Sequence, residues 1–261
     1  MEKISKAQVK MVRSLQQKKY RDESGLFVAE GEKCVEELCK GFELVFGARS
    51  DGERTKELKD EGRFLLATQT EIEQMSGLRT PQGVIGVFRK STDRSQADFR
   101  IENPDRIILA LDGVQDPGNL GTIIRTCDWF GVHDIFCSRD TADCYNPKVV
   151  QATMGALCRV RVHYVDLTEW IETTVSRQNP DVQIYGTLLD GKDMYEVLQP
   201  PIVHSSILLM GNEGNGISAA VRKSVTHPIR IPSYPKDAET SESLNVSIAT
   251  AIALAEFRRP K

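Results

Sequence analysis

The stretch Leu111-Asp-Gly-Val-Gln-Asp-Pro-Gly-Asn-Leu-Gly-Thr-Ile-Ile-Arg-Thr-Cys-Asp-Trp-Phe-Gly131 decides the fold, because it has the pattern of a strand end, a sharp turn and a helix. The apolar run at 107–111 just before it is typical of a central parallel strand. Asn119 stands where a helix N-cap is expected, and Gly131 closes the helix. The stretch therefore predicts an α/β fold.

This helix has two different faces. One face follows the i, i+3, i+4, i+7 pattern of a core stripe, with Leu120, Ile123, Ile124 and Cys127. At about 100° per residue, Arg125 and Trp129 fall on roughly the opposite side. An exposed tryptophan beside an arginine marks a partner surface, or else the arginine stem simply lies over the indole ring. The local pattern leaves both interpretations open.

Composition places the chain among globular proteins of one large or two modest domains, with 261 residues and a net charge of -3. No apolar run approaches the ~18 residues of a membrane span, and the N-terminus lacks an apolar segment, so we expect a cytoplasmic protein. The six cysteines form no C-x-x-C pair and are predicted to be reduced, mostly structural thiols. The four histidines are scattered, which gives no support for a metal site.

The first 21 residues carry a net charge of +6, from seven basic residues and Glu2. Such a segment can contact RNA phosphates even in an acidic protein. The candidate RNA-binding residues are Lys10, Arg13, Lys18, Lys19 and Arg21. The alternative is a solvated amphipathic helix whose inner face holds Ile4, Val9, Val12 and Leu15.

The chain divides into two α/β units. Residues 1–90 hold the basic helix, a strand and turn at 25–31, a helix at 32–39 and strand-like runs at 42–46 and 83–88. The polar segment 91–104 is predicted to be a linker. Residues 105–261 hold expected strands at 107–111, 133–137, 159–164, 182–186, 206–210 and 228–231, which predict a largely parallel sheet.

Two further segments of the second unit follow expected strands, at the sheet edge where open α/β folds bind ligands. The first holds Gly211, Gly214 and Gly216 and ends in a helix opened by Ser218. Its order, G-x-x-G-x-G, differs from the G-x-G-x-x-G of a dinucleotide site, which weakens the alternative of a nucleotide-dependent oxidoreductase. The second leads from Ile231 into the helix 246–257, which is apolar almost all round and must be covered on both sides.

Three motifs in the second unit resemble those of the SpoU/TrmH family of RNA ribose 2′-O-methyltransferases, within the SPOUT superfamily. They are the runs 116–125 and 210–218, and Ile231-Pro232 together with the run 243–247. Their order and spacing also match. The segment between Pro232 and Ser243 is ten residues long and lacks glycine, unlike the short glycine-containing loop usual in the family. The first unit, with the runs 27–31 and 80–83, is similar to the family's L30e-like RNA-binding domain.

The resemblance implies a C-terminal SPOUT domain with a deep trefoil knot, S-adenosylmethionine as cofactor, no metal, and a homodimer whose active site draws on both subunits. The implied cofactor-binding residues are Thr187, Leu188, Gly211, Asn212, Gly216, Ile231 and Leu244. The implied catalytic residues are Asn119, Arg125, Glu213, Ser243 and Asn245. The implied substrate is RNA, with ribosomal RNA favoured and transfer RNA as the alternative. A non-catalytic RNA-binding member of the same fold is the other alternative.

The role of Arg125 is open. Family accounts make this arginine the general base, but a guanidinium has a pKa above ~12 and keeps its proton in proteins. We favour a role in which Arg125 binds the phosphate beside the target ribose and stabilises the developing alkoxide. Glu213 is expected to order Asn119 or the backbone rather than to act as the base.

Overall fold

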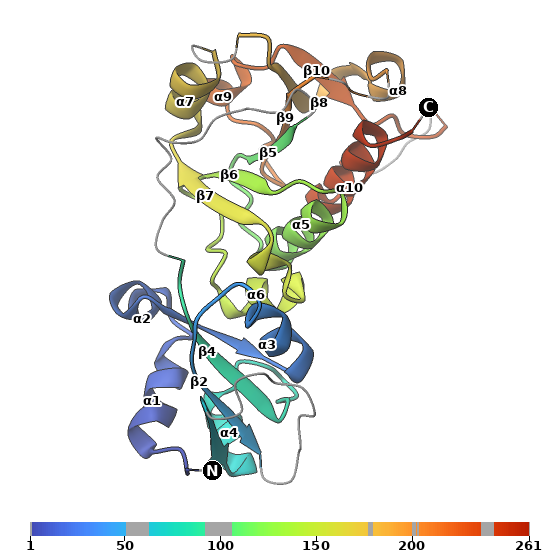
Figure 1. Ribbon diagram of the computed structural model, residues 1–261. Helices are drawn as coiled ribbons and strands as arrows, with labels where there is room; N and C mark the ends of the chain where they lie inside the picture. Colours follow the sequence, from blue (N-terminus) through green and yellow to red (C-terminus); the bar gives the residue numbers. More distant parts are fainter. Residues whose placement is uncertain are drawn as a thin grey trace. The chain divides into compact units, whose positions relative to one another are not determined.

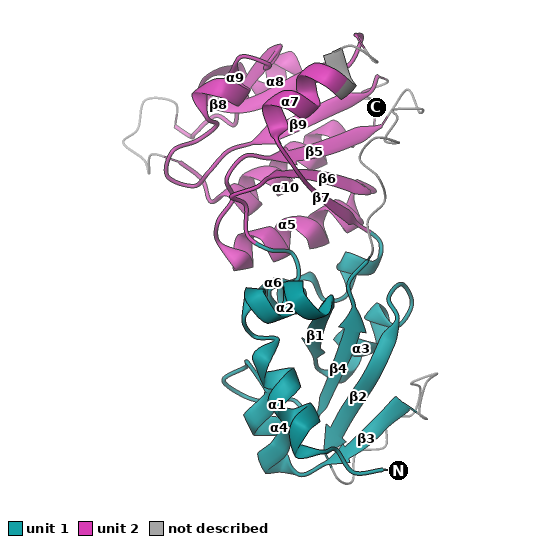
Figure 2. Cartoon of the chain, turned by 90° about the vertical axis from the view of Figure 1, so that its left-hand side faces the viewer, with its two compact units in different colours: residues 1–93, 143–159 teal, residues 94–142, 160–261 magenta. Residues whose placement is uncertain are grey.

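The computed structural model describes residues 2–50, 63–91, 106–176, 180–199, 202, 204–235 and 243–260. The chain forms two compact units, each with its own sheet (Figure 2). Unit 1 consists of Met1–Asp93 and Asp143–Arg159, and unit 2 of Arg94–Ala142 and Val160–Lys261. The linker expected at 91–104 lies, apart from its first residue, outside the described residues.

Unit 1 is a four-stranded mixed sheet with helices packed against it (Figure 1). Its elements are α1 (Lys6–Ser14), α2 (Lys18–Ser24), β1 (Leu26–Glu30), α3 (Glu32–Leu38), β2 (Leu44–Ser50), β3 (Phe64–Ala67), α4 (Gln69–Met75), β4 (Val84–Arg89), α6 (Pro147–Thr153) and η3 (Ala156–Cys158). The strand order is β1-β4-β2-β3, with only β2 and β3 parallel. The inner face expected for the basic segment is confirmed, because Ile4, Val9, Val12 and Leu15 are all buried.

The segment 143–159 packs in unit 1, although the sequence boundary at 105 assigns it to the second domain. Asp143 forms an ion pair with Arg21 at 2.6 Å, and Arg159 forms one with Glu37 at 2.9 Å. The ring of Tyr145 lies 4.8 Å from that of Phe27, centroid to centroid. Unit 1 is therefore completed by a piece of chain that comes after the first strands of unit 2.

Unit 2 is built on a six-stranded sheet in the order β10-β8-β9-β5-β6-β7, in which every neighbouring pair is parallel. Its elements are β5 (Ile107–Leu111), α5 (Pro117–Trp129), β6 (Asp134–Ser138), β7 (Arg161–Val165), α7 (Leu167–Trp170), η4 (Ile171–Ser176), β8 (Gln183–Asp193), α8 (Met194–Val197), β9 (Ser206–Met210), α9 (Ala219–Arg222), β10 (His227–Arg230) and α10 (Val246–Phe257). The parallel sheet expected from the six apolar runs is confirmed. β8 is longer than expected, since it continues to Asp193.

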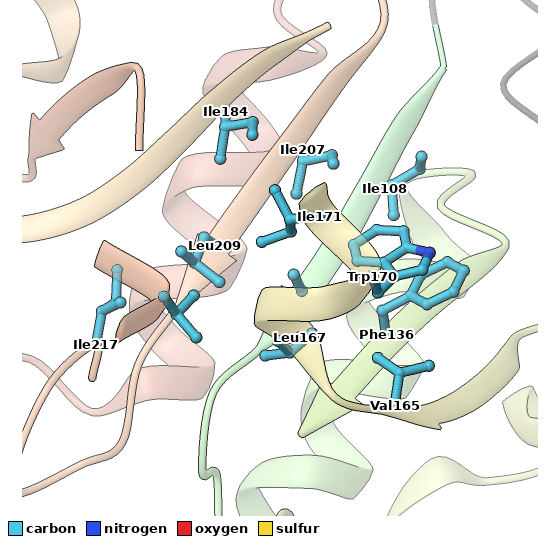
Figure 3. Close-up of a cluster of buried hydrophobic side chains, with 12 residues drawn as sticks. Ile108, Phe136, Val165, Leu167, Trp170, Ile171, Ile184, Ile207, Leu209 and Ile217 are labelled. Atoms are coloured by element: carbon cyan, nitrogen blue, oxygen red, sulfur yellow. The ribbon is translucent and has the colours of Figure 1, made fainter. Parts of the chain in front are cut away.

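Helices cover both faces of this sheet. On one face, residues of α7, η4 and α9 pack on β5, β6, β8 and β9, and the Trp170 ring stacks on Phe136 with centroids 3.9 Å apart (Figure 3). On the other face lie α5 and α10, which contact each other (Figure 1). Phe257 of α10 meets the Tyr185 ring of β8 edge-on, with centroids 5.0 Å apart. The sheet lies between these two helical layers, and loops follow the ends of its strands.

The start of α5 differs from the expectation. The N-cap is Asp116, whose side chain accepts the N–H of Asn119 at 2.8 Å, and Pro117 takes the first helical position. Asn119 is thus the third helical residue, and its side chain is released from capping. The end is as expected, because Gly131 follows the helix with φ +67°.

Of the remaining expectations, the one for the cysteines is confirmed and the one for the knot is not tested. The six cysteines form no disulfides, and burial raises the pKa of Cys34 to about 11, as expected of structural cysteines. The knot implied by the resemblance stays a prediction, and part of the unusual segment after Pro232, residues 236–242, lies outside the described residues. No helix in the described ranges is long and apolar enough to cross a membrane.

Candidate active site

A cleft of about 970 Å³ opens in unit 2 at the carboxyl ends of β8, β9 and β10, a size within the range of small-molecule sites. All seven residues expected to bind a cofactor line it: Thr187, Leu188, Gly211, Asn212, Gly216, Ile231 and Leu244. Glu213 and Ser243, two of the expected catalytic residues, line it as well. Thr187 and Leu188 belong to β8 itself rather than to a loop before it. Two of the three motifs, 210–218 and the pair 231–232 with 243–247, thus line one cavity, whereas the run 116–125 contributes no lining residue.

The glycine loop 211–216 is closed on itself. The N–H of Asn212 donates to the carbonyl of Gly216 at 2.9 Å, and the N–H of Gly216 donates back at 3.0 Å. A Cβ on Gly211 would lie 2.2 Å from the backbone carbon of Gly216. The loop's own backbone therefore occupies the space of a side chain at this position, which requires glycine there.

Asn212 fixes this loop to the neighbouring strand. Its side-chain amide donates to the carbonyl of Gly113, which follows β5, at 2.7 Å. Its side-chain oxygen accepts the N–H groups of Gly214 at 2.9 Å and Asn215 at 3.0 Å. Asn212 therefore lines the cleft with its polar side-chain atoms already engaged within the protein.

Sequence reasoning missed three residues that support the same loop. The largely buried carboxylate of Asp112 accepts the N–H of Ser218, the N-cap of α9, at 2.7 Å. Gly113 adopts φ +73°, and its N–H donates to the hydroxyl of Ser138 at 2.8 Å. These bonds join the ends of β5, β6 and β9 into one support for the cleft. The dipeptide Asp112-Gly113 directly after the apolar run 107–111 is a turn signal that could have indicated these two residues.

Three of the expected catalytic residues form a hydrogen-bonded chain. The side-chain amide of Asn119 donates to the Glu213 carboxylate at 2.9 Å, as expected from the ordering role given to Glu213. The amide of Asn245 donates to the side-chain oxygen of Asn119, also at 2.9 Å. The oxygen of Asn245 caps α10 by accepting the N–H of Ser247 at 2.9 Å. The network therefore ties the first turns of α5 and α10 to the glycine loop.

Arg125 lies apart from this network. It is exposed on α5 and does not line the cleft, and Trp129 on the same helix is 85% exposed. Among the described residues no cation–π contact links the two side chains. The interpretation in which the arginine stem lies over the indole thus has no support in the structure. Both side chains instead face outward on one helix surface.

The basic N-terminal segment is not a uniform charged surface. Arg21 is only 1% exposed, and its guanidinium binds Asp143 and the carbonyl oxygens of Leu15 and Gln16. Its expected role in RNA binding is corrected, because a buried arginine with its donors engaged cannot reach a phosphate. Lys18 pairs with Asp22 at 2.9 Å, and Lys19 with Glu23 at 3.9 Å. Lys10 and Arg13 remain exposed on α1.

Comparison with known proteins assigns the family. Residues 106–255 match the model of the SpoU rRNA Methylase family, and residues 6–86 match an MRM3-like substrate binding domain. The chain belongs to the SpoU rRNA methylase family. The family assignment made from the three motifs is thereby confirmed, as is the α/β fold with a preceding substrate-binding domain.

Relatives of this SpoU family member match it along nearly the whole chain. The 23S rRNA (guanosine(2553)-2′-O)-methyltransferase of Bacillus subtilis is 28% identical over 260 residues, 99% of this chain and 98% of that protein. A TrmH-family RNA methyltransferase structure from Porphyromonas gingivalis is 34% identical, covers 98% of both chains and superposes with a TM-score of 0.82. The AdoMet-bound rRNA methyltransferase from Sinorhizobium meliloti is 30% identical, with a TM-score of 0.83 over 99% of this chain and 96% of that one.

Proposed function

We propose that this SpoU family member transfers a methyl group from S-adenosylmethionine to a ribose 2′-hydroxyl of RNA. The observation that carries the proposal is the cleft, because all the positions expected from the motifs to hold the cofactor line one cavity of suitable volume. The relatives named as rRNA methyltransferases support the reaction class. Ribosomal RNA is the favoured substrate and transfer RNA the alternative, and the enzyme is proposed to work in the cytoplasm.

The cleft fits S-adenosylmethionine, which supplies an already activated methyl group when bound. Leu188, Ile231 and Leu244 would offer apolar surface for the adenine ring, and the backbone groups of the lining that are not bonded within the glycine loop would offer hydrogen bonds. Apolar walls with a few convergent polar groups are typical of such sites. Three residues are proposed to position the loop and not to bind the ligand, because the polar side-chain atoms in question form hydrogen bonds within the protein. They are Asn212, Asp112 and Ser138.

The reaction requires little covalent help from the protein. The chain must place the 2′-hydroxyl in line with the methyl group and exclude water. It must also stabilise the negative charge that develops on the hydroxyl oxygen as the proton leaves. Arg125 is proposed to bind the neighbouring phosphate and stabilise that charge, with the proton passing to phosphate or water. Asn119, Glu213 and Asn245 are proposed to order the polar side of the cleft.

A second subunit is proposed to complete the site. Arg125 does not line the cleft of its own chain. Ile248 is 54% exposed on α10, and α10 contacts α5, the helix that carries the exposed Trp129. The helix α10 buries one side against its own sheet and leaves apolar side chains on the other, which favours coverage by a second copy. In such a homodimer the arginine of one protomer would serve the cleft of its partner.

The cofactor assignment can be tested on the purified protein by thermal shift. S-adenosylhomocysteine is expected to raise the melting temperature in proportion to the logarithm of its concentration, whereas NAD is expected to leave it unchanged. Tritium from labelled S-adenosylmethionine should then enter added ribosomal RNA. Stabilisation by NAD alone would contradict the proposal, and cofactor binding without transfer to any RNA would favour a non-catalytic RNA-binding protein.

Asn212→Ala is expected to weaken S-adenosylhomocysteine binding about tenfold or more, because it removes three hydrogen bonds worth about 1 kcal/mol each that hold the glycine loop. The matched control is Asn215→Ala in the same loop, whose affinity should stay within about twofold of the wild type. Calorimetry would measure both variants. Equal affinities for the two variants would show that the Gly113 contact does not shape the cleft.

A further inference from the structure

The loop between α4 and β4, residues 76–83, is held in place by a buried carboxylate. Glu30, the last residue of β1, is 3% exposed and accepts the backbone N–H of Gly77 at 2.7 Å. It also accepts the hydroxyl of Ser76 at 2.5 Å, and that hydroxyl accepts the N–H of Leu78 at 3.0 Å. Burying a carboxylate is costly unless it is well hydrogen-bonded, so these contacts fix the loop strongly.

Both sides of this loop are pinned as well. The side-chain amide of Gln16, just after α1, donates to the carbonyl of Met75 at 3.3 Å. The side chain of Gln82 lies over Gly31, where a Cβ would be 2.3 Å from its oxygen. The loop therefore has a rigid base, and it presents Arg79 and Thr80 to solvent at its tip. A side chain on a rigid loop loses less conformational entropy on binding than one on a mobile loop.

A stripe of positive charge on α1 leads toward the same loop. Lys6, Lys10 and Arg13 follow the i, i+4, i+7 pattern and are all exposed. Gln16, which touches the loop, stands three residues after Arg13 in the turn that follows α1. Within the described residues, no carboxylate forms an ion pair with these three side chains or with Arg79.

The neighbouring helix α2 differs in this respect. Its cations are already neutralised, since Lys18 and Lys19 pair with carboxylates of the same helix and Arg21 is buried. A lysine in such a pair must first break the pair before it binds a phosphate, and this costs free energy. An unpaired cation does not incur that cost. The carboxylate that contacts the loop, that of Glu30, is buried and already accepts hydrogen bonds from Ser76 and Gly77.

We infer that Lys6, Lys10, Arg13 and Arg79 form one phosphate-binding surface on unit 1, which binds the backbone of the RNA substrate. The choice of RNA as the ligand rests on the proposed function. The surface is smaller than the whole basic segment 1–21, and it includes Arg79, which lies far from that segment in the sequence. Unpaired cations in a row match successive phosphates, and the planar guanidinium of Arg79 suits a two-pronged contact with one of them. Such contacts position the RNA without reading its sequence.

The test is filter binding of purified 23S ribosomal RNA to the full-length protein over a range of salt concentrations. The variant Lys10→Gln/Arg13→Gln/Arg79→Gln is expected to lose at least about tenfold in affinity and to flatten the salt slope by about one for each phosphate contact removed. The control Lys18→Gln/Lys19→Gln removes paired cations instead and should stay within about twofold of the wild type. S-adenosylhomocysteine affinity should be unchanged in both variants, which shows that unit 2 is intact.

The outcomes separate this inference from the proposed function. If the wild type neither binds nor methylates RNA, the proposed function itself fails. If the wild type does both and the triple variant keeps its affinity and salt slope, the phosphate-binding surface is refuted while the function stands. An equal loss in the α2 control would also overturn the inference, because charge would then matter wherever it lies. Arg79→Gln alone should reduce the salt slope, and an unchanged slope would remove the loop from the surface.

Discussion

Arg125→Ala is expected to lower methyl transfer about a hundredfold or more, the loss typical of one preorganised charge-stabilising group. The melting temperature should hardly change, because Arg125 is exposed on α5 and away from its buried stripe. Single-turnover methyl transfer to RNA and thermal unfolding would measure the two effects. Full activity in this variant would remove Arg125 from the mechanism.

Arg125→Lys separates two possible roles. It keeps the charge but loses the planar fork that binds a phosphate at two points, so it should recover only part of the activity. Full recovery would reduce the requirement to a single positive charge at this position.

Mixing two inactive variants tests where Arg125 acts. If it serves the partner's cleft, dimers of one Arg125→Ala subunit and one Asn119→Ala subunit contain one intact site. A random mixture should then show about a quarter of wild-type activity. If Arg125 acts within its own chain, every site in the mixture is damaged, and no activity above that of the separate variants would appear.

Ile248→Glu is expected to convert a dimer into a monomer with little methyl transfer. The side chain is 54% exposed on the apolar α10, and a charge there would be buried without a partner in the proposed interface. The wild type should sediment as a dimer at low micromolar concentration. Tyr20→Glu, which also places a charge at an exposed aromatic but on α2, should remain a dimer. A fully active wild-type monomer would contradict the interface.

The sequence predicted unit 2 well because its strands are short apolar runs between turn residues. The run 107–111 became β5 with every residue buried, and the motif loops followed their strands as expected. The helix boundary at Asn119 was wrong because Asp116-Pro117 is the stronger start signal, with the cap before the proline. Thr68 and Glu71 form a capping box that could have located α4, which the sequence analysis did not place.

Other features depend on contacts that sequence patterns do not reveal. Arg21 reads as one more surface cation, and its burial follows from Asp143, which lies 122 residues later in the chain. The same long-range packing draws the segment 143–159 into unit 1. The reason for Gly211 is more local, because the atoms that exclude a Cβ belong to the returning backbone of Gly216 in the same loop. The spacing of the glycines indicates a tight turn but does not show which backbone atoms approach each other.

The most direct test of ribose methylation by this protein is the chemical identity of the methylated product. Ribosomal RNA would be incubated with the protein and labelled S-adenosylmethionine, digested to nucleosides and separated by mass spectrometry, with Arg125→Ala as the control. We expect label in a single 2′-O-methylnucleoside, strongly reduced in the control. Label in a base-methylated nucleoside, or none in RNA although S-adenosylmethionine binds, would contradict this expectation.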